Sequence, residues 1–429
     1  MPDLSDLFES GKKLILILCA IFGVFIVAVI GLKIYKNVTA DKTPIVSITA
    51  KNNEIYRTTD TIEAKDFAIT AKHKDGGTST VKADSVAKIS RKHVHGYGKT
   101  TKVKITLKNG ISCETEVTNE RNKIVSFDVS KYNKDKVTAT LYSNGELAFE
   151  GNGEVFGYGG NGMPWKDTSN EDIRKTGISA ITFGKNVKIV DGTSFFSGLS
   201  GVTYVSPLPA TLVSANSMFS GCSSLKAMPD MSKCAVLRDM SSAFSDCTSL
   251  TKTSVIPASV VSAPDMFYDC TSLQKGAVFA AGSHLTDGAE MYTKCSSLTD
   301  PGVLPKKLDS MDSMFSECTN LTKMPKIPNT VTSMTKAFNS CRLLKSFTTI
   351  PSGVSYLSGC FGNCTYLSGT IRINANAEEY NGMFGGSATT TKINLVGKSK
   401  LLNNYAYTSE NPQGHIYVRG HAAKDPDEF

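Results

Sequence analysis

The chain has 429 residues, of which 40% are hydrophobic and 20% charged, a composition typical of folded proteins. These values exclude a disordered tail and a small disulfide-stabilised domain, and the length leaves room for two or three domains. The formal net charge is +8, and much of the excess lies between residues 44 and 126, which hold 15 Lys and Arg against 9 Asp and Glu.

Residues 14–32 read LILILCAIFGVFIVAVIGL, 19 uncharged residues bounded by Lys12, Lys13 and Lys33. A helix of that length nearly crosses a bilayer, so we expect a transmembrane helix after a cytoplasmic stub of residues 1–13. The alternative is a signal peptide cleaved near the VTA sequence at 38–40, although the apolar run is longer than such peptides have. The flanking lysines favour neither orientation. Because nearly all of the foldable chain follows the helix, we expect a single-pass protein of the cell membrane with its N-terminus inside and its C-terminal region extracellular.

After a linker (33–43), residues 44–126 have a β pattern. FAITAKHKDGGTSTV alternates apolar and polar residues around a DGG turn, and TKVKITLKNGISCETEV does so around an NG turn. The pattern predicts two hairpins in a small β-sandwich. The run RTTDTIEAKDFAITAKHKDGGTSTV also resembles bacterial immunoglobulin-like domains, which implies a spacer without a catalytic role.

Residues 88–108 contain seven Lys or Arg, two His and no acid. Such a basic hairpin would attract an anionic wall polymer or lipid headgroups, and no nucleic acid is expected as a partner. The structural alternative is a strand edge whose lysines discourage aggregation. His93 and His95 share one strand face, but no carboxylate or cysteine lies nearby in sequence, so no metal is expected. The candidate polyanion-binding residues are Lys88, Arg91, Lys92, Lys99, Lys102 and Lys104.

Two nucleotide-binding patterns in the chain are incomplete. Gly157, Gly159 and Gly162 match G-x-G-x-x-G, but Pro164 follows where a long helix would have to begin. The VGKS at 396–399 has Lys392 at the position where a phosphate-binding loop needs its first glycine. No cofactor is therefore expected, and residues 127–170 are assigned to the N-terminal cap of the array that follows.

An aromatic residue then recurs at intervals of 23 or 25 residues, followed by cysteine three positions later and leucine three beyond that. The period is that of leucine-rich-repeat coils, each of which must stack on its neighbours to bury its apolar face. We predict a mainly β fold with short helices: a right-handed leucine-rich-repeat-type solenoid of about nine coils over 171–397, then a C-terminal cap and tail (398–429). We expect one short parallel strand after each leucine and a helical or 3₁₀ turn before each cysteine.

These recurring positions form what we call the ladder. Its aromatics are Phe196, Phe219, Phe244, Phe267, Tyr292, Phe315, Phe338, Phe361 and Phe384. Its cysteines and leucines are Cys222, Leu225, Cys247, Leu250, Cys270, Leu273, Cys295, Leu298, Cys318, Leu321, Cys341, Leu344, Cys364 and Leu367.

The phrases MFSGCSSL, MFYDCTSL and MFSECTNL, with the IPxxV runs at 256–260, 327–331 and 350–354, resemble the BspA-type leucine-rich repeats of bacterial surface proteins. The segment ATLYSNGELAFEGNGEVFGYGGNGMPWKD is similar to the one that opens those arrays. The resemblance implies a surface-exposed, non-enzymatic binding scaffold and does not fix a ligand.

Three interpretations apply to the ladder cysteines. Spacings of 23 or 25 residues do not suit zinc, whose ligands cluster within a few residues. Stacked coils would bring the thiols within disulfide reach, but equivalent positions in a parallel stack point the same way, which is poor disulfide geometry. We therefore expect reduced, buried thiols that fill one corner of each coil.

The array contains no acid pair or nucleophile constellation, so we expect no enzyme. Function is expected in the exposed residues that differ between coils, and a row of Lys252, Lys275 and Lys323 is the candidate partner-binding site. The leading hypothesis is a membrane-anchored surface protein that binds a protein or glycan partner. The alternative is a structural component of an envelope assembly, such as a conjugation, secretion or pilus apparatus.

Overall fold

The computed structural model describes residues 44–52, 62–90, 100–118, 121–159, 162–345, 349–387, 393–399, 416–418 and 421–422. The predicted transmembrane segment 14–32 lies outside these residues. In the part of the chain that is described, no helix combines the length and apolar character needed to cross a bilayer. The prediction of a mainly β chain with few helices is confirmed. The chain divides into two compact units, with the boundary near residue 120.

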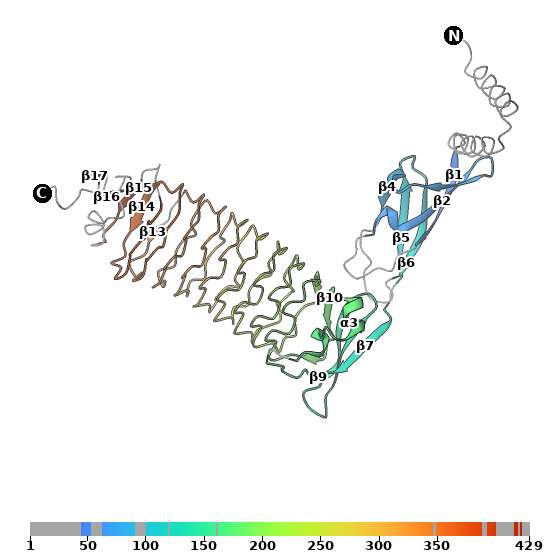
Figure 1. Ribbon diagram of the computed structural model, residues 1–429, viewed down its shortest axis with the longest axis horizontal. Helices are drawn as coiled ribbons and strands as arrows, with labels where there is room; N and C mark the ends of the chain where they lie inside the picture. The colour runs from blue at the N-terminus through green and yellow to red at the C-terminus, as the bar shows by residue number, and fades with distance from the viewer. Residues whose placement is uncertain are drawn as a thin grey trace, which may run out of the picture. The chain divides into compact units, whose positions relative to one another are not determined.

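Unit 1 consists of two three-stranded antiparallel sheets (Figure 1). One sheet holds β1 (Ile45–Asn52), β2 (Phe67–His73) and β3 (Thr78–Val81), and the other holds β4 (Val86–Ile89), β5 (Thr100–Leu107) and β6 (Ser112–Thr118). Two 3₁₀ turns, η1 (Ala64–Asp66) and η2 (Ala83–Ser85), precede β2 and β4. Both predicted hairpins are confirmed, since β2 pairs with β3 and β5 with β6.

One hydrophobic core serves both sheets of unit 1. Side chains along β2 alternate between buried and exposed, because successive residues of a strand point to opposite faces. The Thr115 hydroxyl donates a hydrogen bond of 3.0 Å to the Ala50 carbonyl and so links β6 with β1. The buried core residues are Ile48, Ile62, Phe67, Ile69, Ala71, Val103, Ile105, Leu107 and Val117.

Unit 2 begins with an antiparallel meander that becomes a parallel sheet. β7 (Lys123–Asp128), β8 (Lys136–Tyr142) and β9 (Glu146–Glu154) pair antiparallel. β10 (Ala180–Phe183) and β11 (Val187–Lys188) pair parallel with β9, and β12 (Tyr204–Val205) pairs parallel with β10. Between β9 and β10 lie η3 (Pro164–Lys166) and the short helix α3 (Glu171–Thr176), whose N-cap is the Asn170 side chain. The meander thus provides the edge on which the first coil is stacked.

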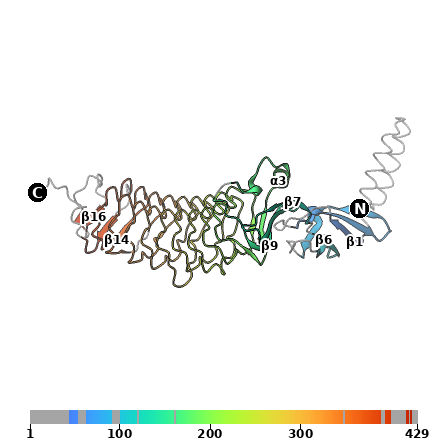
Figure 2. The same cartoon turned by 90° about the horizontal axis from the view of Figure 1, so that it is seen from below.

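From β10 onward the chain winds into coils that lie one beside the next in both ribbon views (Figures 1 and 2). Isolated parallel bridges link the same corner of successive coils, in the order Asp191, Ser214, Asp239, Ser262, Asp287, Ser310, Ser333, Tyr356 and Glu379. The last described coils form the sheet of β13 (Thr349–Ile350), β14 (Gly369–Ile373), β15 (Ile393–Val396), β16 (Ile416–Val418) and β17 (His421–Ala422). All of its pairings are parallel except that of β16 with β17.

The prediction of one strand in every coil is wrong for the central coils. Among the described residues between β12 and β13, only single-residue bridges occur on this wall, such as Ala227 with Lys252 and Ile256 with Phe279. Prolines such as Pro257 and Pro305 have no N–H to donate to a ladder of strand hydrogen bonds, which explains the interruption.

The opposite wall of each coil is a run of turns that carries most of the hydrogen bonding between coils. Around Phe315, the residues two before and two after it, Ser313 and Glu317, have φ of 53° and 60°. The N–H groups of these three residues donate to carbonyls of the following coil at 2.8 Å, whereas the residues between them donate within their own coil. With a left-handed residue at every fourth position, the chain follows a path on which every second N–H points at the neighbouring coil.

Candidate functional site

The ladder forms the centre of the array. All nine ladder aromatics are at most 1% exposed, and neighbouring rings stack with centroids 5.4–6.1 Å apart and interplanar angles of 8–22°. Cysteines and leucines of the ladder are fully buried beside them. All of the repeated side chains are therefore inside the coils, and none of them is available to a ligand.

Each ladder cysteine also has a polar contact that the sequence did not reveal. Its thiol donates to the backbone carbonyl of the aromatic residue in the preceding coil, as Cys318 does to Tyr292, with sulfur–oxygen distances of 3.0–3.2 Å. In the last such coil Ser387 stands in the cysteine position, and its hydroxyl donates to the Phe361 carbonyl in the same way. The position therefore selects a small hydrogen-bond donor, which both residue types provide.

The thiols are free and electrostatically unsuited to chemistry. No disulfide joins the described cysteines, and every one of them in the array is buried. Burial raises the pKa of the Cys222 and Cys364 thiols to about 12 and that of Cys234 to about 11. Reactive cysteines have lowered pKa values and partial exposure, the opposite of this environment.

Trp165 and Lys166, in the segment 127–170 assigned from the sequence to the N-terminal cap, bond to the first coil through contacts that the sequence did not reveal. The indole N–H of Trp165 donates to the Phe195 carbonyl at 2.9 Å, and the Lys166 ammonium donates to the Ser194 carbonyl at 2.6 Å. In later coils the carbonyl equivalent to that of Phe195 accepts an N–H from the preceding coil, as the Met218 carbonyl does from Phe196. Trp165 thus supplies the donor that a missing preceding coil would have given.

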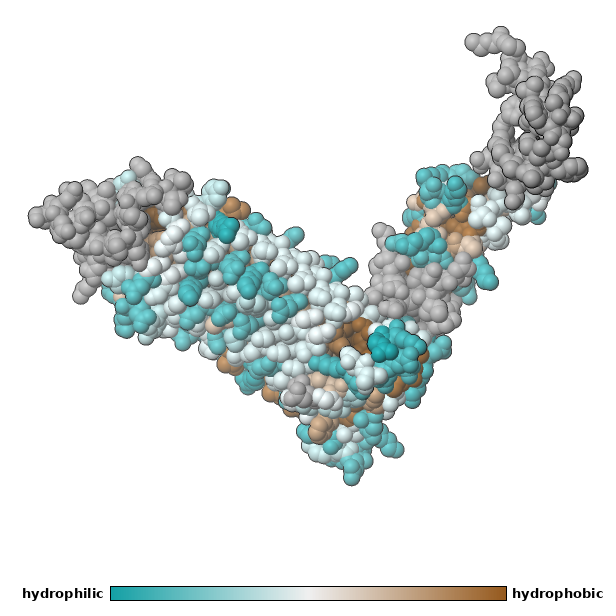
Figure 3. Space-filling model, in the orientation of Figure 1, coloured by the Kyte–Doolittle hydropathy of each residue, from teal (hydrophilic) through white to brown (hydrophobic). Residues whose placement is uncertain are grey.

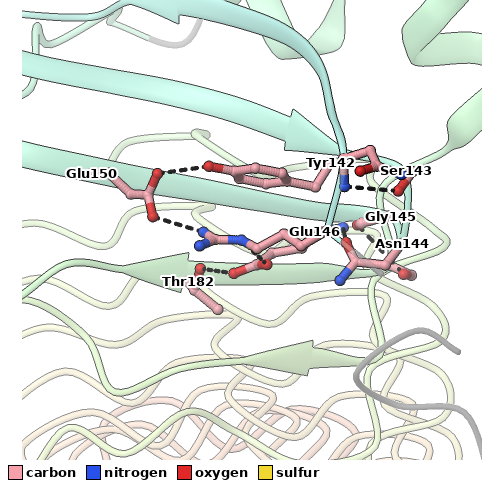
Figure 4. A network of polar contacts seen from close by, with 10 residues as sticks. Tyr142, Ser143, Asn144, Gly145, Glu146, Glu150 and Thr182 are labelled. Carbon is pink, nitrogen blue, oxygen red and sulfur yellow. Dashed lines mark hydrogen bonds and ion pairs between the residues drawn. The ribbon is translucent and has the colours of Figure 1, made fainter. Parts of the chain in front are cut away.

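A polar cluster lies where the meander meets the first coil (Figure 4). The Arg121 guanidinium contacts the Glu146 carboxylate at 3.1 Å and the Glu150 carboxylate at 2.7 Å, and lies 4.0 Å from the centre of the Tyr142 ring. The Tyr142 hydroxyl donates to Glu150 at 2.9 Å, and the Thr182 hydroxyl donates to Glu146 at 2.5 Å. Burial raises the pKa of Glu146, against the opposing effects of its Thr182 and Arg121 contacts. Because one arginine bridges both carboxylates, the cluster ties β8, β9 and β10 together rather than presenting an acid pair.

The three lysines proposed from the sequence are exposed on the wall opposite the turns, but they are not an uninterrupted row. Lys252 bridges with Ala227 in the preceding coil, and Lys275 bridges with Asp300 in the following one. The Lys275 ammonium lies 3.6 Å from the Asp300 carboxylate, which stands between Lys275 and Lys323 in the order of coils. Asp300 therefore offsets part of the charge that the lysine row was expected to present.

Acidic residues lie across from part of the basic segment of unit 1. Lys102 and Lys104 are exposed on β5 and lie directly across from Glu116 and Glu114 on β6. Lys88 is exposed on β4, while Arg91, Lys92 and Lys99, together with His93 and His95, lie outside the described residues. Opposite charges in such cross-strand positions stabilise a sheet and lower its net potential.

The turn wall of the central coils carries acids that the sequence analysis did not single out. They lie in successive coils at positions with positive φ, and include Asp246, Asp265, Asp269, Glu290 and Glu317. Burial raises the pKa of Asp265 and Asp269, and neighbouring carboxylates such as Glu290 and Asp246 add to the effect. Figure 3 shows hydrophilic residues dispersed among near-neutral ones along the array. Among the described residues, no three His, Cys, Asp or Glu side chains come together in a way that would hold a metal ion.

Coils of 23 or 25 residues, each with a buried aromatic and leucine and each bridged in parallel to the next, define a leucine-rich-repeat protein. The family model described as BspA type leucine rich repeat region matches residues 169–299 and 286–412 in six copies, together more than half of the chain. The chain belongs to this family.

Several solved structures are similar to this chain. The leucine rich repeat protein of T. pallidum is 21% identical, with 56% of this chain and 90% of that chain covered and a TM-score of 0.31. A leucine-rich repeat protein from Bacteroides ovatus is 22% identical over 51% and 70%, with a TM-score of 0.28. The pneumococcal vaccine antigen PcpA is 13% identical over 70% and 98%, with a TM-score of 0.27. A search of curated proteins gave no match.

Proposed function

We propose that this chain is a membrane-anchored bacterial cell-surface protein whose repeat array, a right-handed leucine-rich-repeat-type solenoid, binds a protein or glycan partner without catalysing a reaction. The observation that carries the proposal is the division of residues within each coil. The aromatic, cysteine and leucine that recur are buried, whereas exposed residues of the wall opposite the turns, such as Lys252, Lys275 and Asp300, differ from coil to coil. A surface that varies on a constant scaffold suits recognition.

The proposal gives the remaining regions supporting roles. Residues 14–32 would anchor the chain in the cell membrane with the N-terminus inside, as their length and composition suggest. Unit 1, with its two sheets on one core, would be an immunoglobulin-like spacer. The exposed Lys88 and its basic neighbours in sequence would contact anionic wall polymer or lipid headgroups.

Protease shaving tests the location. Intact producer cells are treated with trypsin, which does not enter them, and the chain is followed with an antibody against the array. We expect the array to be released from intact cells, since it would lie outside. Protection of the array in intact cells, with digestion after lysis, would contradict the proposed orientation.

A gene deletion tests binding. We expect cells without the gene to adhere less to immobilised host matrix proteins and glycans, and the full-length chain supplied from a plasmid to restore adhesion. Crosslinking of the full-length chain on intact cells is the parallel measurement. If adhesion is unchanged and crosslinks form only to the producer's own envelope proteins, the protein belongs instead to an envelope assembly.

A further inference from the structure

A groove lies beside one of the two longer coils of the array. The interval from Phe267 to Tyr292 is 25 residues and the next, from Tyr292 to Phe315, is 23, so the wall formed by residues 274–286 is longer than the one that follows it. Between the two walls lies a groove of about 760 Å³, within the range of ligand-binding sites. We call it the 278/303 groove, after the valine on each side.

The groove is lined mainly by apolar groups that are open to solvent. Val278 is 54% exposed and Val303 is 84% exposed, the most exposed large hydrophobic side chain among the described residues. Phe279 is half-buried between them and the core, and Leu304 closes the floor. An exposed valine alone is ordinary, but several apolar side chains around one hollow indicate an interaction site.

The groove is held open by residues particular to this coil. A Cβ atom on Gly276 would lie 2.3 Å from the Pro301 carbonyl oxygen, so glycine lets the two walls meet at this end. Tyr292 stands where all of the other ladder aromatics are phenylalanine. Its buried hydroxyl accepts a hydrogen bond of 2.9 Å from the Ala277 N–H. The one tyrosine of the ladder thus satisfies a backbone donor beneath the groove.

The two sides of the groove are joined at one end, where the Gly276 N–H donates to the Asp300 carbonyl at 2.8 Å, but not along their middle. Residues 278–280 form hydrogen bonds to the preceding coil, on the side away from the groove. The Ile256 N–H donates to the Val278 carbonyl, and the Ala280 N–H donates to the Ile256 carbonyl. Within these described coils, no backbone hydrogen bond joins residues 278–280 to residues 303–305. Because Ile256 pairs with Phe279 in a parallel bridge, the Phe279 N–H and carbonyl point away from the preceding coil and toward the groove, where an extended peptide can pair with them.

Charge at the groove favours an acidic occupant. Lys275, at the end near Gly276, is paired with Asp300. Lys306 and Lys307, at the other end, are both exposed, and in the described structure no carboxylate lies within ion-pair distance of either. Two uncompensated ammonium groups at one end of an apolar groove complement a carboxylate that follows an apolar side chain.

We propose that the 278/303 groove binds an extended segment of a protein partner, with an apolar side chain between Val278 and Val303 and an acidic residue against Lys306 and Lys307. The proposal rests on the proposed function, since it names the partner class and the place on the array where recognition occurs.

The test uses a phage-displayed library of random linear 12-residue peptides panned against the full-length chain. The enriched sequences are synthesised with fluorescein, and their affinities are measured by fluorescence anisotropy. We expect an apolar residue followed by Asp or Glu in the enriched peptides. Val303→Asp should weaken binding by at least about tenfold, because it places a carboxylate in the apolar part of the groove. The double variant Lys306→Glu with Lys307→Glu should bind acidic peptides more weakly and basic peptides more tightly than the wild type does.

The matched control is Val255→Asp, because Val255 is a valine with 52% exposure that does not line this groove. It should bind the peptides as the wild type does, and circular dichroism should show all variants folded. The proposal is overturned if no peptide is enriched, if Val303→Asp binds as tightly as Val255→Asp, or if lauric acid rather than any peptide occupies the groove. If deletion of the gene reduces cell adhesion and the Val303→Asp chain supplied from a plasmid restores it fully, the groove proposal is rejected and the proposed function stands. If deletion leaves adhesion unchanged, the proposed function itself is rejected.

Discussion

Each ladder cysteine combines a buried volume with a hydrogen bond to the preceding coil, and these two contributions can be separated. The Cys318 thiol donates to the Tyr292 carbonyl at 3.1 Å, and Ser387 makes the equivalent bond with a hydroxyl. We expect Cys318→Ser to be more stable than Cys318→Ala by about 1 kcal/mol, because only serine keeps the donor. Urea unfolding of the full-length chain measures the difference. A more stable alanine variant would mean that apolar volume, not the hydrogen bond, selects the residue.

Stability should also fall at alkaline pH because of the buried thiols. In the folded chain the pKa values of Cys222 and Cys364 are raised to about 12, whereas an unfolded thiol ionises near pH 9. Their contribution is complete below pH 9 and is lost as pH rises toward 12, at roughly 1.4 kcal/mol per thiol per pH unit. Urea midpoints at pH 8, 9.5 and 10.5 in the presence of reductant measure this loss.

The control is the double variant Cys222→Ser with Cys364→Ser. It lacks two of the ionising thiols, so its unfolding free energy should decline less steeply between pH 9.5 and 10.5 than that of the wild type. Lysine and tyrosine titration affects both chains equally. Identical slopes would show that the thiols do not contribute to the alkaline loss.

At the scale of one coil, the turn wall stores strain at its left-handed residues. Glu317 has φ of 60°, and the same position in other coils is occupied by Gly198, Gly221 and Gly386. A residue with a Cβ costs about 1 kcal/mol in this conformation, whereas glycine does not. We expect Glu317→Gly to be more stable than Glu317→Ala by about that amount, although glycine is the more flexible residue when unfolded. Both variants remove the same charge, so thermal unfolding isolates the backbone effect. A more stable alanine variant would contradict it.

The coil could be predicted from the sequence, but most of the contacts that shape its surface could not. The spacing of Phe219, Cys222 and Leu225 determines the coil, because a buried repeat leaves a periodic signal. Left-handed positions such as Ser313 and Glu317 carry no such signal, since serine, aspartate, glutamate, lysine and glycine all occur there. Contacts between distant segments were equally hidden, since nothing in the sequence brings Arg121 to Glu146. The 278/303 groove had one visible trace particular to its coil, the tyrosine of the ladder, beside the two extra residues that the Phe219–Phe244 coil also has.

At the scale of the whole molecule, two separate cores suggest two unfolding transitions, and one residue can tell them apart. Trp165 is the only tryptophan of the chain and lies buried in the cap of the array. Its fluorescence therefore reports on unit 2 alone, whereas far-ultraviolet circular dichroism reports on both units. Ile105 is fully buried in the core of unit 1, and Phe315 is a central rung of the ladder in unit 2.

We expect Phe315→Ala to lower the stability of unit 2 by about 3–5 kcal/mol, because it removes a buried ring and the two stacking contacts that the ring makes. The tryptophan transition should shift to lower urea, even though Phe315 lies several coils from Trp165, since the aromatic stack is continuous from Phe196 to Phe384. Ile105→Ala should shift only the other component of the circular dichroism signal. If Phe219→Ala moves the tryptophan transition and Phe315→Ala does not, the array unfolds coil by coil, and the stack does not couple its ends.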